Sequence, residues 1–114
     1  MNQTPDTKRI YKEQEIRSAT PAELVAHLYD FGIEACYRED QQRLLDVLSQ
    51  LVKSLNFDYD ISSEFYRLYD FCRQKARENQ FEDARMILED MREAWAEVVK
   101  TQRPNRKASL NLNA

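Results

Sequence analysis

Apolar residues recur three and four positions apart through most of the chain, which is the period of an amphipathic helix. The repeat changes phase at residues 39–40, is interrupted by a loop at 56–60 rich in Asn and Asp, and fails at Asn79. These breaks predict four helices: one from Pro21 to about Arg38, one from about Gln41 to Leu55, one capped by Asp60 or Ser62 that ends at Asn79, and one from about Glu82 to Lys100.

Each predicted helix has an apolar face that we expect to form the core. On the first helix this face comprises Leu24, Leu28, Phe31 and Ala35, with Val25, Gly32 and Cys36 beside them. The other faces comprise Leu44, Val47, Leu48, Leu51, Val52 and Leu55; Ile61, Phe65, Leu68, Tyr69, Cys72 and Ala76; and Phe81, Ala84, Ile87, Leu88, Met91, Trp95 and Val98. Short connections favour antiparallel neighbours, so the predicted fold is all-α, an antiparallel up-and-down four-helix bundle with a short N-terminal arm.

The segment Thr20-Pro21-Ala22-Glu23 marks the start of the first helix. The Thr20 hydroxyl can accept a backbone hydrogen bond, Pro is tolerated at the first helical position, and Glu23 completes a capping box. We therefore expect an N-terminal arm (1–19), a helical bundle domain (20–100) and a disordered C-terminal tail (101–114).

Composition and charge exclude several classes of protein. One glycine and three prolines leave few residues for the turns of an all-β fold. A net charge of −3 and a pI near 5.2 give no electrostatic footprint for nucleic acid. The chain has no signal-peptide core and no apolar run long enough to span a bilayer, so we expect a cytoplasmic protein without membrane insertion.

Groups that could carry chemistry are few. We expect Cys36 and Cys72 to be reduced thiols on the inner faces of two helices. His27, the single histidine, suggests a phosphotransfer bundle, but its helix offers Asp30 one turn away and no cation before Arg38. A carboxylate-bridged metal site needs Glu-x-x-His on two helices, which this chain lacks. We expect no catalysis, metal or cofactor, and phosphotransfer remains a disfavoured alternative.

Aromatic residues are more numerous than the core requires. The chain has six tyrosines and five phenylalanines, although Leu, Ile and Val already supply the bundle faces, and Tyr66 and Phe71 lie off the stripe of the third helix. Two explanations stay open. The extra tyrosines lie at the rim with their hydroxyls in water, or the aromatic residues line an apolar groove for a helix of a partner protein.

Three motifs resemble the FliS family of flagellar secretion chaperones. They are Tyr11-x-x-x-x-Ile16-x-Ser18-Ala19-Thr20-Pro21-x-Glu23-Leu24 followed by Leu28-Tyr29-Asp30, then Leu68-Tyr69-Asp70-Phe71, and finally Arg92-Glu93-Ala94-Trp95. Between Tyr37 and Leu44 the chain is shorter than the family pattern by about ten residues, roughly one and a half turns of each of two helices. The sequence also departs from the family at Ala26, His27 and Phe31, and we expect a shortened groove.

The resemblance implies a cytosolic chaperone that binds the C-terminal segment of flagellin, prevents premature polymerisation and assists delivery to the export gate. It also implies an arm that folds over part of the binding surface. The expected partner-binding residues are Ile10, Tyr11, Ile16, Leu24, Leu28, Tyr29, Tyr66 and Tyr69. The alternative within this class is a FliS-like bundle that binds a different flagellar or regulatory protein.

Overall fold

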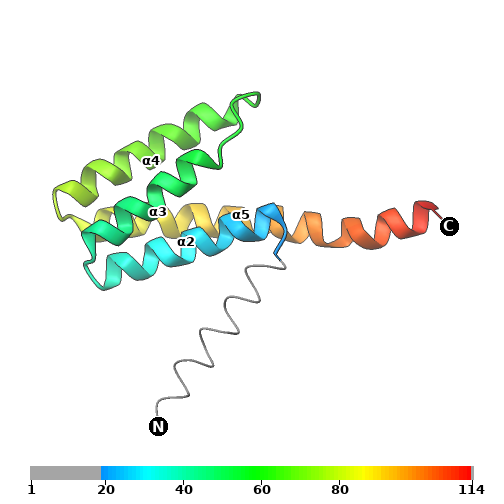
Figure 1. Ribbon diagram of the computed structural model, residues 1–114, viewed down its shortest axis with the longest axis horizontal. Coiled ribbons are helices and arrows are strands. Elements are labelled where there is room, and N and C mark those ends of the chain that lie inside the picture. The colour runs from blue at the N-terminus through cyan, green and yellow to red at the C-terminus, as the bar shows by residue number, and fades with distance from the viewer. Residues whose placement is uncertain (1–18, 114) are drawn as a thin grey trace, which may run out of the picture.

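The computed structural model describes residues 19–113, and side chains for residues 19–100. It contains four helices, α2 (Pro21–Tyr37), α3 (Gln41–Lys53), α4 (Ile61–Arg77) and α5 (Phe81–Asn113) (Figure 1). Helix α2 packs against α3 and α5, and α4 packs against the same two helices. The helices therefore form a closed ring in which α2 and α4 lie on one diagonal. The predicted all-α four-helix bundle is confirmed.

The capping box that begins α2 is present as predicted. The backbone N–H of Glu23 donates to Thr20 Oγ1 at 3.1 Å, and the Thr20 N–H donates to Glu23 Oε1 at 2.9 Å. The Thr20 hydroxyl and the Glu23 carboxylate each accept a hydrogen bond from a backbone N–H that has no partner within the helix. Pro21 follows at the first helical position, so this local sequence determines the start of α2.

Two tight turns at one end of the bundle use residues in the left-handed region. Glu39, between α2 and α3, has φ 55°, and Asn79, between α4 and α5, has φ 58°. Asp40 then caps α3 by accepting a hydrogen bond from the Arg43 N–H at 3.1 Å. Asn tolerates this conformation because its short side chain can bond locally, and the predicted end of the third helix at Asn79 is confirmed.

The loop between α3 and α4 differs from its prediction. Asp60 stands at the N-cap position of α4 but makes no side-chain cap bond. Ser62 is buried, and its hydroxyl donates to the Asn56 carbonyl at 2.6 Å. The prediction that Asp60 or Ser62 caps the helix was wrong. The Asp60 backbone is helical, at φ −59° and ψ −35°, whereas the capping residues Thr20 and Asp40 are extended. The Ser62 hydroxyl bonds to a loop carbonyl instead.

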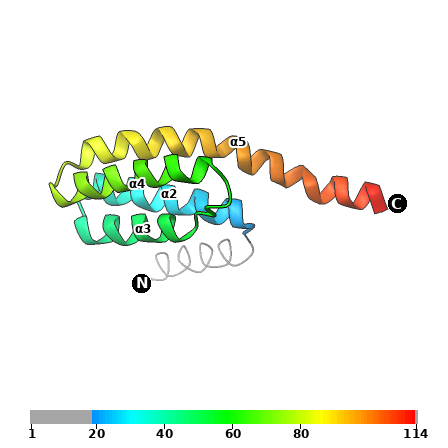
Figure 2. The same ribbon diagram turned by 90° about the horizontal axis from the view of Figure 1, so that it is seen from above.

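Helix α5 projects past the ends of the other three helices (Figures 1 and 2). The apolar periodicity predicted that this helix ends near Lys100, whereas it continues to Asn113. The apolar stripe stops at Val98, so periodicity carries no signal for this continuation. The division at residue 100 into a bundle domain and a disordered tail stays a prediction. Residues 1–18 of the predicted N-terminal arm lie outside the residues that the structure describes.

The core lies between the four inner faces and confirms much of the predicted pattern. Buried positions that match it are Gly32, Ala35, Cys36, Leu44, Val47, Leu48, Leu51, Tyr69, Cys72, Ala76, Ala84, Leu88 and Met91. Other predicted residues pack against this core from partly buried positions: Val25, Leu28, Phe31, Val52, Leu55, Phe65, Phe81, Ile87 and Trp95. The prediction fails on α4 at Ile61 and Leu68, which are 50% and 38% exposed.

Helix α2 confirms the predicted face at Gly32, Ala35 and Cys36, but it also buries Ala22, Ala26 and Tyr29, which the prediction did not include. Leu24 is 38% exposed, and Leu28 and Phe31 are only partly buried. Small residues lie inside because α2 approaches its neighbours closely: a Cβ added to Gly32 would lie 3.1 Å from Leu88 Cδ1 and 3.3 Å from Val47 Cγ1. Leu24 is consequently exposed, whereas Leu28 and Phe31 pack against the edge of the core.

Candidate partner-binding surface

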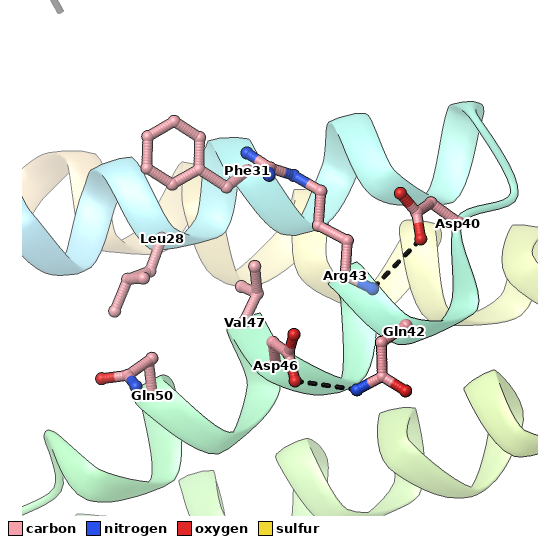
Figure 3. A pocket seen from close by; sticks show the side chains of 8 residues that line it. All are labelled: Leu28, Phe31, Asp40, Gln42, Arg43, Asp46, Val47 and Gln50. Atoms are coloured by element: carbon pink, nitrogen blue, oxygen red, sulfur yellow. Dashed lines mark hydrogen bonds between the residues drawn. The ribbon is translucent and has the colours of Figure 1, made fainter.

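Large apolar residues of α2 form one wall of a groove beside α3. Leu28 and Phe31 line a pocket of about 460 Å³ together with Val47 of α3 (Figure 3). Leu24 lies one turn before Leu28 on the same stripe of α2. The polar residues of the pocket are Asp40, Gln42, Arg43, Asp46 and Gln50. We call the surface formed by these nine residues the α2/α3 groove.

The rim of the α2/α3 groove is held in place by local contacts. The Arg43 guanidinium lies 5.6 Å from the centre of the Phe31 ring, a cation–π distance. The imidazole of His27 stacks beside the same ring at 6.4 Å. On the α3 side, the Gln42 amide donates to Asp46 Oδ1 at 2.9 Å. The groove thus has an apolar floor with fixed polar edges, as protein-binding surfaces commonly do.

Two of the predicted binding residues, Tyr29 and Tyr69, lie in the core. They are 0% and 1% exposed, and their hydroxyl oxygens are 2.6 Å apart across the α2–α4 diagonal. Trp95 and Phe65 surround them, with ring centres 6.4 Å from Tyr29 and 6.3 Å from Tyr69 respectively. Burial raises the pKa of both phenols, so both stay neutral. In this structure the pair is a core contact and presents no surface to a partner.

Tyr66 lies on a separate surface. It is 38% exposed and contacts the Phe57 ring edge-on at 6.2 Å. The Arg73 guanidinium lies 5.8 Å from its centre and pairs with Asp70 at 3.1 Å. Of the predicted residues that the structure describes, Leu28 lines the α2/α3 groove and Leu24 lies one turn before it. Ile10, Tyr11 and Ile16 lie outside the described residues.

Sequence reasoning predicted Leu24 and Leu28 as partner contacts and missed the other residues of the groove: Phe31, Asp40, Gln42, Arg43, Asp46, Val47 and Gln50. Phe31 and Val47 were assigned to the core, and Arg43 was not singled out. The available signal was that Phe31 follows Leu28 by three residues, so that it shares a face with the expected binding residues. Nothing in the sequence indicated that Arg43 approaches Phe31 through packing between helices.

The described residues offer little reactive chemistry. Burial raises the pKa of Cys36 to about 11 and that of Cys72 to about 12, so both thiols are protonated at neutral pH. No cluster of His, Cys, Asp or Glu in the described part of the chain could hold a metal ion. Among the described helices, none combines the length and the apolar character that a membrane span requires. The fold defines a helical-bundle protein.

The comparisons with known proteins identify the family. The family model described as "Flagellar protein FliS" matches residues 37–102, and the chain belongs to the FliS family. The chain is 24% identical over 120 residues to the "Flagellar secretion chaperone FliS" of Bacillus subtilis (strain 168), which covers 87% of this chain and 90% of that protein. No solved structure matches the chain. The second and third sequence motifs fall inside the family match, whereas the first precedes it.

Proposed function

We propose that this protein is a cytoplasmic export chaperone that binds the C-terminal segment of flagellin in its α2/α3 groove. Binding keeps the segment from polymerising before export, and the complex is delivered to the flagellar export gate. Membership of the FliS family supports the coarser part of this function, a chaperone of flagellar protein export. The chaperone acts stoichiometrically, without chemistry on its cargo.

The observation that carries the proposal is the incompletely buried stripe Leu24, Leu28 and Phe31. A bundle normally turns its large apolar residues inward, yet here small residues occupy most of the interior positions of α2: Ala22, Ala26, Gly32, Ala35 and Cys36, with Tyr29 among them. Leu24 is 38% exposed in a small acidic protein that is otherwise rich in surface charge. Exposed apolar surface of this kind is typical of a site that another protein covers.

The groove also fits the cargo in chemical terms. An amphipathic segment can lay its apolar face on Leu28, Phe31 and Val47 while its polar edges meet the rim of Arg43 and Asp46. Such a segment orders only on binding, and coupled folding of this type buries about 1,000–3,000 Å². The chaperone would thereby cover the apolar surface that a flagellin monomer otherwise uses to polymerise.

The experiment is a titration of a fluorescein-labelled flagellin C-terminal peptide, followed by fluorescence anisotropy. Leu24→Asp places a charge on the groove and should weaken binding at least about tenfold, which corresponds to 1.4 kcal/mol. Leu68→Asp is the matched control, because Leu68 is the same residue type with the same 38% exposure on the diagonally placed α4.

Circular dichroism melts of both variants show whether each keeps its fold. A peptide that binds Leu24→Asp as tightly as wild type would remove the α2/α3 groove as its site. Failure of the wild-type protein to bind the peptide at all would remove flagellin as the cargo and favour a different flagellar partner.

A further inference from the structure

A second apolar surface lies on α4, where three large residues are exposed. Ile61 is 50% exposed, Leu68 is 38% exposed and Phe71 is 43% exposed. Ile61 and Leu68 are seven residues apart, and Phe71 is three residues further, so all three lie on one flank of the helix. The proposed cargo groove involves none of them.

This flank of α4 faces α5. Lys75 continues the seven-residue row of Ile61 and Leu68, and its ammonium group lies 5.1 Å from the Phe71 ring centre and 3.7 Å from Asp83 of α5. Beyond Asp83, α5 presents Ile87, Met91, Ala94 and Val98 with spacings of four, three and four residues, the repeat of a helix–helix seam. Ala94 is exposed, and Ile87 and Val98 are partly exposed. We call Ile61, Leu68, Phe71, Ile87, Ala94 and Val98 the α4/α5 face.

The α4/α5 face lies across the bundle from the α2/α3 groove. The ring order α2–α3–α4–α5 places these two helix pairs on opposite sides (Figures 1 and 2). A protein bound to one side therefore leaves the other side uncovered. The row from Ile61 to Lys75 spans about 21 Å at 1.5 Å per residue, enough for roughly four turns of a docked helix.

Acidic residues outnumber basic ones on and beside the α4/α5 face. Glu64 lies seven residues before Phe71 on the same side of α4, and Asp83, Asp90 and Glu97 follow α5 at seven-residue spacing. The basic residues there are Lys75 and, at the outer edge of α4, Arg67. Asp83 pairs with Lys75, and Glu97 pairs with Lys100 at 3.6 Å. Among the described residues, no ion pair is found for Glu64 or Asp90. A helix that brings Lys or Arg to these two carboxylates would complement the border.

We infer that the α4/α5 face is a second docking site, and that its occupant is an amphipathic helix with basic flanks from another protein. The small side chain of Ala94 admits close approach of that helix, while Leu68 and Phe71 supply the apolar contact area. The chaperone then holds its cargo on one side and a second protein on the other. A second copy of this chain would fit less well, because it would bring the same acidic border to the contact.

The test uses a defined probe with the full-length protein. The probe is a synthetic amphipathic peptide with leucine at heptad positions a and d and lysine elsewhere, labelled for anisotropy at physiological ionic strength. We expect Leu68→Asp to weaken its binding at least tenfold and Leu24→Asp to leave it unchanged. Both substitutions add one negative charge, so the two variants attract the basic peptide non-specifically to the same extent. The double variant Glu64→Gln/Asp90→Asn should weaken binding at least threefold.

Two further arms separate the competing explanations. A peptide with glutamate in place of lysine should bind at least tenfold more weakly, and saturation with the flagellin C-terminal peptide should leave the lysine peptide bound. Equal losses in both Asp variants, displacement by the flagellin peptide, or equal affinity for the glutamate peptide would overturn the inference. So would a wild-type dimer in sedimentation that Leu68→Asp dissociates, because the occupant would then be a second copy. The lysine-peptide result does not depend on whether flagellin binds.

Discussion

The hydroxyl pair of Tyr29 and Tyr69 offers the sharpest test of the core. Each ring is buried, and each hydroxyl has the other as its hydrogen-bond partner at 2.6 Å. Tyr29→Phe keeps the ring but leaves the Tyr69 hydroxyl buried without this partner, which costs about 1–3 kcal/mol. Tyr69→Phe has the same effect on Tyr29. The double variant removes both polar groups, so its stability should lie within about 1 kcal/mol of wild type.

The prediction is therefore strong non-additivity, measured by urea denaturation of the four proteins of the cycle. The double variant should lose less unfolding free energy than the sum of the two single losses, by at least about 1 kcal/mol. That difference lies within the range measured for residues in direct contact. Unchanged denaturant slopes show that the comparison is one of stability. Two small losses that simply add would mean that the hydroxyls are hydrated in solution and that the core contact across α2 and α4 is not formed.

Three further predictions test the remaining parts of the fold. Thr20→Ala should destabilise the protein by about 0.5–2 kcal/mol through loss of the cap, and Thr20→Ser should retain most of that stability in the same denaturation assay. Trp95→Ala removes a ring that contacts the aromatic core and an indole N–H that donates to the Ala22 carbonyl at 2.7 Å, so it should cost about 3 kcal/mol; a loss under about 1 kcal/mol would contradict this packing. The folded-state pKa values of Cys36 and Cys72 are raised from 9.0 to about 11 and about 12, so their contribution to stability is complete below pH 9 and is lost as the pH rises toward 12. Each thiol should contribute a slope of up to about 1.4 kcal/mol per pH unit, and Cys72→Ala should reduce the slope of urea midpoints measured between about pH 8 and 11.

Local sequence signals predicted the start of α2 and the end of α4, but not the cap of α4 or the end of α5. The capping box at Thr20 and the left-handed Asn79 each depend on a few adjacent residues, so they can be recognised without knowledge of the fold. The turn at Glu39 was placed by the change of apolar phase. The buried face of α3 was also predicted correctly, because the apolar residues of this helix occupy one side only.

The face of α2 could not be predicted in the same way. This helix is apolar around much of its circumference, so periodicity alone does not decide which side is inward. Size favoured Leu24, Leu28 and Phe31 for the centre of the core, whereas close packing selected Ala22 and Ala26 beside Gly32. That difference concerns the proposed binding surface directly, since Leu24 is exposed and Leu28 and Phe31 line the α2/α3 groove from the edge of the core.

The candidate site was predicted only in part for a related reason. Leu24 and Leu28 were expected to contact a partner through the family resemblance, and they lie on the groove. Tyr29 belongs to the same motif but points into the core, where it meets Tyr69 from a helix forty residues away in sequence. Contacts of this kind depend on tertiary packing and leave no local signature.

The most direct test of the cargo site is site-specific photocrosslinking to a purified flagellin C-terminal peptide. p-Benzoylphenylalanine replaces Phe31 in the α2/α3 groove or, as a matched control, Phe71 on the α4/α5 face. We predict a crosslinked product from position 31 that unlabelled peptide competes away, and no product from position 71. Crosslinking from position 71 with none from position 31 would contradict the assignment of flagellin to the α2/α3 groove.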